Sequence, residues 1–176
     1  MQDRNPNHQQ LVRFVLSAVA LYLVWFFGYE QWLKPAGKLD TALSLNLASV
    51  SAAVLRAVGV PAVATERLVL VAGKPAVWVG DPCNGQVLYA LFIGFILAFP
   101  GGGWRRKLPF MALGVVAIYL LNIVRVGALT LNHLYSRGTV DFNHHYTFTF
   151  VVYGCIFLLW MLWVRRFAAP QMPSHA

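Results

Sequence analysis

The chain has 176 residues, of which 59% are apolar or aromatic and 11% are charged, whereas soluble domains carry about 25% charged residues. This composition excludes a soluble globular protein, and the high hydrophobicity excludes an intrinsically disordered one. Two cysteines are too few for a disulfide-stapled secreted domain. An integral membrane protein remains, and its net charge of +8 need not indicate nucleic acid binding, because Lys and Arg also set orientation in a bilayer.

Four stretches approach the length of a membrane-spanning helix, for which about 20 mostly apolar residues are needed. The first is predicted to be an uncleaved anchor, because no small-x-small cleavage site follows its apolar run. The expected spans are about 11–33, 86–103, 108–134 and 146–164. Residues 34–85 form the extracytoplasmic region, and we expect residues 1–176 to be a single integral membrane domain.

The basic residues predict the orientation of these spans. With both termini cytoplasmic, the inner side carries seven basic residues against one acidic residue, and the outer side carries seven against five. The clusters Arg105–Lys107 and Arg165–Arg166 then adjoin span ends on the inner side, as the positive-inside rule requires. We therefore expect a multi-pass inner (cytoplasmic) membrane protein, with the lipid bilayer as a partner and no nucleic acid partner.

Residues 41–60 are apolar but rich in Ser and Ala. Large apolar residues recur at helical spacing on one side of this segment, while Ser44 and Ser51 fall elsewhere; the stripe is Leu43, Leu47, Val50, Val54 and Val58. This pattern favours an amphipathic helix lying in the outer leaflet. The alternative is a fifth span, which would move the N-terminus outside.

After Pro61, residues 67–71 and 76–79 flank a turn that contains Gly and Pro. Short β-branched runs around such a turn predict a β-hairpin. The expected fold class is therefore an all-α polytopic membrane protein with about four transmembrane helices, an outer-leaflet amphipathic helix and a short extracytoplasmic β-hairpin.

Arg125 lies 17 residues into the third apolar run, where an ionisable side chain is costly and is a functional candidate by default. It shares one helical stripe with other polar residues; the stripe is Asn122, Arg125, Leu129, Asn132 and His133. A purely structural reading, in which Arg125 reaches the outer headgroups or pairs with Asp141, is equally compatible with this position.

Cys83 stands in the string Asp81-Pro-Cys-Asn84-Gly, where the outer loop becomes the second span. Asp81 suits an N-cap and Pro82 the first helical position, which would place the thiol in the first turn of a helix. The positive end of the helix dipole favours the nucleophilic thiolate there. Alternatively, the string is an ordinary turn and the cysteine is incidental.

Cys155 lies about nine residues into the fourth span, so it is about 14 Å below the outer surface. A disulfide requires Cα atoms within about 7 Å. The predicted depths therefore argue against a Cys83–Cys155 disulfide, and Cys155 is expected to be a packing residue.

His144 and His145 open the fourth span at the same outer level, and histidine is the usual proton carrier near neutral pH. An interfacial polar loop is the plain alternative. A metal site is disfavoured, because no carboxylate or second cysteine stands at a spacing that would complete a tetrahedral ligand set. Together, the thiol, the guanidinium and the imidazole converge on one outer layer from three spans, which suits cysteine acyl transfer.

The ordered motifs Pro82-Cys-Asn84-Gly, Asn122-Ile-Val-Arg125-Val and His144-His145 resemble those of the exosortase/archaeosortase membrane transpeptidases over roughly the C-terminal half of the chain. Members of that family carry one histidine, or in the archaeal branch an arginine, at the third motif. Of the two histidines in this chain, His145 is chosen because it is nearer the helix and shares a face with Thr149.

The resemblance implies an enzyme that cleaves exported proteins at a C-terminal sorting signal, made of a motif, a transmembrane helix and a basic tail, and transfers them to an acceptor. Cys83 would form a thioacyl-enzyme, Arg125 would stabilise the oxyanion or the thiolate, and His145 would move protons. His144, Asn84 and Asn122 would be supporting or alternative residues. The active site would face the extracytoplasmic side, and no metal or cofactor is required.

The alternative function is a non-enzymatic membrane adaptor or transporter subunit that uses Arg125 and His144/His145 to bind an anionic ligand. A thiol oxidoreductase is disfavoured, because the sequence has no Cys-x-x-Cys. A rhomboid-type serine protease is disfavoured too, because no Gly-x-Ser-x-Gly-like elbow lies in a span.

Overall fold

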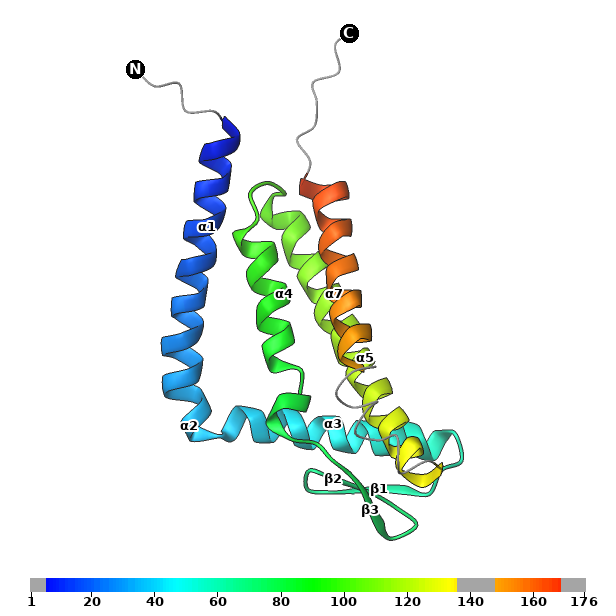
Figure 1. Ribbon diagram of the computed structural model, residues 1–176. Coiled ribbons are helices and arrows are strands. Elements are labelled where there is room, and N and C mark those ends of the chain that lie inside the picture. The colour runs from blue at the N-terminus through cyan, green and yellow to red at the C-terminus, as the bar shows by residue number, and fades with distance from the viewer. Residues whose placement is uncertain (1–5, 136–147, 169–176) are drawn as a thin grey trace, which may run out of the picture.

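The computed structural model describes residues 6–135 and 148–168 (Figure 1). In chain order the elements are α1 (Pro6–Trp25), the π-helix η1 (Phe26–Leu33), α2 (Lys34–Ala36), α3 (Lys38–Ala57), β1 (Ala62–Thr65), β2 (Leu68–Val71), β3 (Lys74–Trp78), the 3-10 helix η2 (Asp81–Cys83), α4 (Gln86–Ala98), α5 (Trp104–Tyr135), α7 (Phe148–Trp163) and the π-helix η5 (Val164–Ala168). The expected fold class, a helical membrane protein with a small β-hairpin, is confirmed.

Three helical segments of the described chain are long and apolar enough to cross a membrane. They are His8–Ala36 with 29 residues, Trp104–Leu134 with 31 and Thr149–Arg166 with 18. The apolar helix α4 has 13 residues, so it is about 20 Å long and ends five residues before the predicted limit of residue 103. Among the described residues, three helices are therefore long enough to span a membrane and α4 is a shorter apolar helix, where about four spans were expected.

The end of α4 is set by the residues that follow it. Pro100 cannot continue the hydrogen-bond ladder, and Gly101 and Gly102 adopt positive φ angles of 96° and 66°. The ammonium group of Lys107 then donates to the carbonyl oxygens of Leu97 at 3.1 Å and Phe99 at 3.0 Å. Lys107, counted in the sequence as an orientation signal, therefore also satisfies carbonyl groups at the carboxyl end of α4.

The helices α1, α4, α5 and α7 run roughly alongside one another, and α3 crosses one end of them at a steep angle (Figure 1). Gly37, with φ 64°, ends α2 and turns the chain into α3. The start of α1, the α4–α5 connection and the end of η5 all lie at the opposite end of the helices. Because α3 crosses the others and is not among the candidate spans, the structure favours the amphipathic helix over a fifth span.

α3 packs against the rest of the protein mainly through residues outside the apolar stripe that was expected to face the outer leaflet. Val54 and Val58, which belong to the expected apolar stripe, are 47% and 69% exposed. The buried residues are instead mainly small or polar: Asp40, Ser44, Leu47, Ala48, Ser51, Ala52 and Leu55. Small side chains let the sheet and α5 approach the helix closely, which is the usual way helices pack in membrane proteins.

The predicted β-hairpin is formed by β2 and β3, and a third strand, β1, pairs with β2 in an antiparallel sheet. Ala72 and Gly73, with φ 49° and 76°, make a two-residue turn of the kind that matches strand twist. β1 was not predicted, because its sequence Ala-Val-Ala-Thr has few large β-branched residues. Arg56 at the end of α3 donates to the carbonyl oxygen of Ala62 at 2.9 Å, which fixes the start of β1.

The buried apolar residues form two clusters that share α5. The first, here called the outer cluster, joins α3, the sheet and α5, and contains Leu47, Ala48, Ala52, Leu55, Ala62, Val69, Val71, Val79, Ile123 and Val126. The second, the inner cluster, joins α4, α5 and α7, and contains Phe92, Ile96, Phe110, Ile118, Val152, Ile156 and Trp163. α1 packs on α4 through Phe14, and the centroid of its ring lies 6.0 Å from the ring centroid of Phe95.

The contact between Gly114 and Phe92 generates a stability prediction. A Cβ at position 114 would overlap the fully buried ring of Phe92, whereas a Cβ at Gly94 on α4 would meet nothing within 4 Å. Gly114→Ala should therefore cost about 1–3 kcal/mol, and Gly94→Ala should be neutral or stabilising. The midpoint of thermal unfolding in detergent measures both, and equal midpoints for the two variants would contradict this packing.

Candidate active site

Cys83 is the last residue of η2, so it lies three residues before α4 rather than inside its first turn as predicted. Its amide donates to the carbonyl oxygen of Gly80 at 2.9 Å. Gly85, in a left-handed conformation with φ 83°, is the N-cap of α4. The thiol is half-buried and packs against the outer cluster. We call residues 81–85 the cysteine loop.

Asn84 anchors one end of the cysteine loop and is 3% exposed. Its side-chain oxygen accepts a hydrogen bond from the amide of Gln86 at 2.9 Å, which closes a local turn. Its side-chain nitrogen donates to the Asp40 carboxylate at 2.7 Å. The hydroxyl of Tyr29 donates to the same carboxylate, 3.0 and 2.9 Å from its two oxygens.

Asp81 anchors the other end of the loop. It does not cap a helix with its side chain as expected, because Gly80 is the N-cap residue of η2 and Gly85 is that of α4. The carboxylate of Asp81 instead accepts from Arg67 at 2.6 Å, and the same guanidinium donates to the hydroxyl of Thr41. Both ends of the cysteine loop are therefore tied to α3, through Asp40 and Thr41.

Asp40 and Tyr29 belong to none of the sequence motifs. The signal that could have identified Asp40 is its position, because it is a carboxylate at the start of an apolar helix in a membrane protein. Such a group requires partners to remain buried. Its partners lie 11 and 44 residues away along the chain, so spacing could not identify them.

Asn122 brings the second motif to the cysteine loop. It is fully buried on α5, and its side-chain nitrogen donates to the carbonyl oxygen of Ile118 at 3.0 Å. A Cβ added to Gly85 would lie 2.6 Å from this nitrogen and 3.1 Å from the hydroxyl of Tyr89. The absence of a side chain at Gly85 therefore allows the loop to approach α5.

Arg125 lies one helical turn beyond Asn122 and is half-buried. Its neighbours Ile123 and Val126 belong to the outer cluster, against which Cys83 packs. All members of the stripe predicted on this helix are buried or half-buried: Asn122, Arg125, Leu129, Asn132 and His133. The loop with the thiol and the helix with the guanidinium therefore share one packed layer.

The third predicted motif, His144 and His145, lies outside the described residues, as does Asp141. The structure therefore does not test the choice between the two histidines. Cys155 lies on α7 and is half-buried, and neither Cys83 nor Cys155 forms a disulfide.

Several buried polar atoms in this layer have no hydrogen-bond partner among the described residues. Two of them belong to the site itself: the side-chain oxygen of Gln86, directly after the cysteine loop, and that of Asn122. Ser44 and Ser51 on the buried face of α3 have hydroxyl groups in the same state. These atoms are fully buried, and a buried polar group without a partner is costly.

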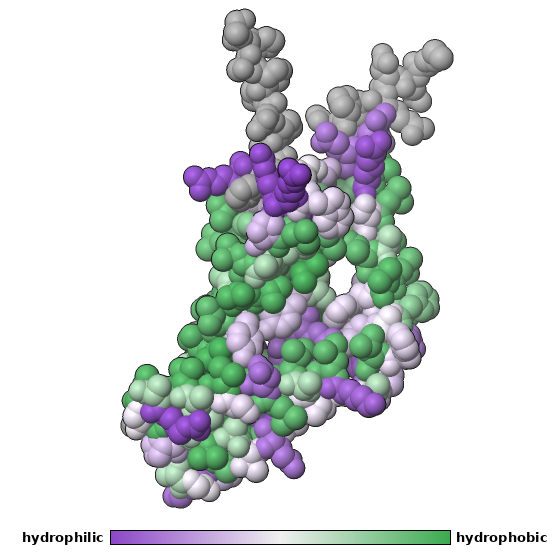
Figure 2. All heavy atoms as spheres, turned by 180° about the vertical axis from the view of Figure 1, so that it is seen from behind, coloured by the Kyte–Doolittle hydropathy of each residue, from purple (hydrophilic) through white to green (hydrophobic). Residues whose placement is uncertain are grey.

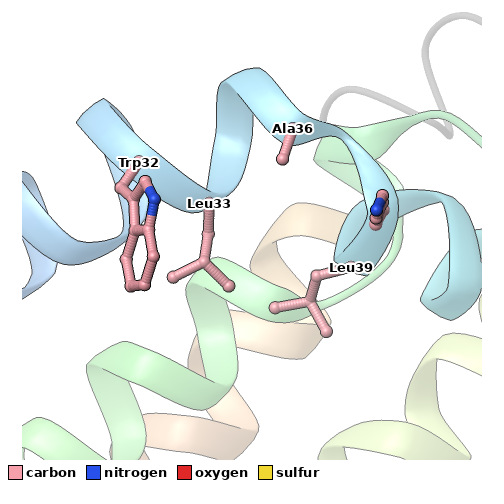
Figure 3. A pocket seen from close by; sticks show the side chains of 5 residues that line it. Trp32, Leu33, Ala36 and Leu39 are labelled. Atoms are coloured by element: carbon pink, nitrogen blue, oxygen red, sulfur yellow. The ribbon is translucent and has the colours of Figure 1, made fainter.

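Apolar surface adjoins the site on the side of the long helices. Figure 2 shows a hydrophobic belt over the helices, between a hydrophilic end and the mixed surface of α3 and the sheet. A groove of about 500 Å³ lies at the corner between η1 and α3, lined by Trp32, Leu33, Ala36, Lys38 and Leu39. The side chains of Trp32, Leu33 and Leu39 point the same way from this corner (Figure 3), one residue away from the buried Asp40.

The contact of Gly85 with Asn122 generates a second prediction. Gly85→Ala introduces both left-handed backbone strain, which costs about 1–2 kcal/mol, and a clash with Asn122. Gly59 is the matched control, because it has φ 86° but nothing within 4 Å of an added Cβ. Gly85→Ala should lower the midpoint of thermal unfolding more than Gly59→Ala does, and an equal loss would show that the contact with Asn122 contributes nothing.

Comparison with family models matches residues 7–165 to the transmembrane exosortase family. Comparison with curated proteins and with solved structures finds no match. The match covers all three sequence motifs and every described helix that could span a membrane nearly to its ends. The apolar helices identify a membrane protein, and the chain belongs to the transmembrane exosortase family.

Proposed function

We propose that this protein is a membrane-embedded cysteine transpeptidase that cleaves C-terminal sorting signals of exported proteins and transfers the cleaved proteins to an acceptor. Family membership supports a membrane transpeptidase role in protein sorting in general. The observation that carries the specific proposal is the approach of Gly85 to Asn122. It brings the loop with Cys83 against the helix that carries Arg125, although the two motifs are far apart in sequence.

The proposed chemistry is acyl transfer through a thioester. His145 takes the proton of the Cys83 thiol, the thiolate sulfur attacks the scissile carbonyl carbon, and the carbon–nitrogen bond breaks as His145 gives this proton to the leaving amine. The acceptor nucleophile, deprotonated by His145, then attacks the thioester; the carbon–sulfur bond breaks, and the released thiolate regains the proton from His145. Arg125 stabilises the oxyanion of each tetrahedral intermediate or the thiolate, and His144 is the alternative proton carrier.

The polar layer and the apolar surface suit the two parts of such a substrate. The buried polar residues Asn84, Gln86 and Asn122 place a polar layer beside the loop that carries Cys83, which supports binding of the polar backbone around the scissile bond. The hydrophobic belt around α1, α4 and α5 supports binding of a transmembrane helix within the bilayer. The basic tail of the sorting signal completes the substrate that we propose.

The distribution of charge supports the proposed orientation. Arg13, Arg105, Arg106, Arg165 and Arg166 belong to the segments at the end where α1 starts and η5 finishes. We assign this end to the cytoplasm by the positive-inside rule. The cysteine loop, at the other end, then faces the extracytoplasmic side of the inner membrane.

The nucleophile is tested by comparing the two cysteines of the chain. The substrate is a co-expressed, epitope-tagged exported protein that ends in a motif, a transmembrane helix and a basic tail. Cys83→Ala and Cys83→Ser should each lower the rate at which it is processed by at least about a hundredfold. Cys155→Ala should process it normally, because that thiol is a packing residue. Immunoblots of substrate size and of enzyme abundance measure both, and normal processing by Cys83→Ala would refute the proposed mechanism.

Substitutions at Arg125 distinguish the proposed enzyme from the alternative function of a ligand-binding adaptor. Removing a donor to an oxyanion slows acyl transfer by about a hundredfold or more, so Arg125→Gln should strongly impair processing. Arg125→Lys should recover a part of the rate, because the charge is kept and the guanidinium geometry is lost. If Arg125→Lys had full function and Cys83→Ala were also fully functional, the adaptor function would be favoured instead.

A further inference from the structure

Asp40 is buried where three segments of the chain meet. It stands in the first turn of α3, is 2% exposed, and accepts hydrogen bonds from Tyr29 on η1 and Asn84 in the cysteine loop. Neither donor carries a positive charge. A carboxylate held in this way is costly to bury, so its hydrogen bonds constrain the segments that supply them.

The neighbouring residue on α3 contributes the second link. Thr41 accepts from Arg67, which also pairs with Asp81 at the start of the loop. This link is the weaker one, because the side chain of Asp81 is 52% exposed, and exposed ion pairs contribute little to stability. The buried bond between Asp40 and Asn84 therefore provides most of the restraint on the loop.

Cys83 lies between these two anchors. Its position follows from the 3-10 turn that begins at Asp81 and from the side chain of Asn84, the next residue. A shift of Asn84 away from Asp40 would move the thiol relative to α5, where Asn122 contacts Gly85. Tyr29 also links Asp40 to the first helix, because the centroid of its ring lies 4.2 Å from the ring centroid of Trp25.

We propose that Asp40 is a positioning residue of this enzyme: through Asn84 it holds the cysteine loop, and hence the thiol of Cys83, in its reactive place, while Tyr29 fixes the carboxylate from the end of the first membrane helix. The inference rests on the proposed role of Cys83 as the nucleophile. It adds two residues to the functional unit that none of the three sequence motifs contains.

The proposal is tested by exchanging the donor and the acceptor of the hydrogen bond between positions 40 and 84. Asn84→Asp places two carboxylates face to face and should slow substrate processing at least tenfold. Adding Asp40→Asn reverses the bond, because the new amide can donate to the new carboxylate and its oxygen can accept from Tyr29. The double variant should therefore process the substrate within about threefold of the wild-type rate.

The rate of thiol labelling tests the same residues in an experiment that needs no substrate. In a Cys155→Ala background, Cys83 is the single thiol, and a maleimide reagent should label it several times faster in Asp40→Ala and Asn84→Asp, because the loop separates from α3. The double variant should return the labelling rate toward the wild-type value. Glu30→Gln is the control, because Glu30 adjoins Tyr29 in sequence but forms an exposed ion pair with Lys34, and it should change neither rate.

The outcomes separate this inference from the proposed function. A double variant that processes substrate no faster than Asn84→Asp alone, or normal processing and labelling by Asp40→Ala at normal abundance, would overturn the positioning role of Asp40. Normal processing by Cys83→Ala would instead overturn the proposed mechanism, and the labelling rates would still report whether Asp40 holds the loop. Tyr29→Phe, which keeps the ring, should give a smaller effect of the same sign as Asp40→Ala.

Discussion

The packing of α5 is the constraint on which the rest of the structure depends. This helix of 32 residues is the element that contributes to both hydrophobic clusters, with Ile118 in the inner one and Ile123 and Val126 in the outer one. The inner cluster holds α4 and α7, and the outer cluster holds α3 and the sheet. Asn122 lies between Ile118 of the inner cluster and Ile123 of the outer one, and Arg125 lies between Ile123 and Val126 of the outer cluster. Apolar packing of α5 therefore sets the positions of both residues relative to α4 and α3.

The polar residues of the site are held within this apolar frame by a small number of buried hydrogen bonds. In an apolar environment an unpartnered polar group is costly, so each bond restricts the conformations open to the loop. The bonds of Asn84 to Asp40 and to the amide of Gln86 leave the cysteine loop little freedom.

Much of the helical architecture could be predicted from the sequence, because apolar length and basic clusters are local properties. Residues 11–33 and 108–134 were expected as spans and lie within the helices found there. The end of α4 was predicted five residues too late, because hydropathy does not register Pro100 and the conformations of Gly101 and Gly102. The strand β1 was missed, because its short side chains give a weak β signal and its pairing with β2 is a tertiary contact.

The candidate site could also be predicted only in part from the sequence. By itself, the sequence determined which residue types are chemically unusual for a membrane protein, namely Cys83, Arg125 and the two histidines, because the cost of a charged or polar group in a bilayer depends on its identity and depth. The tertiary structure decided which of the described residues meet. Gly85 approaches Asn122, and Asp40 accepts from Asn84 and Tyr29, through contacts that depend on how α3 and α5 pack. No periodicity or spacing within a single segment encodes that packing.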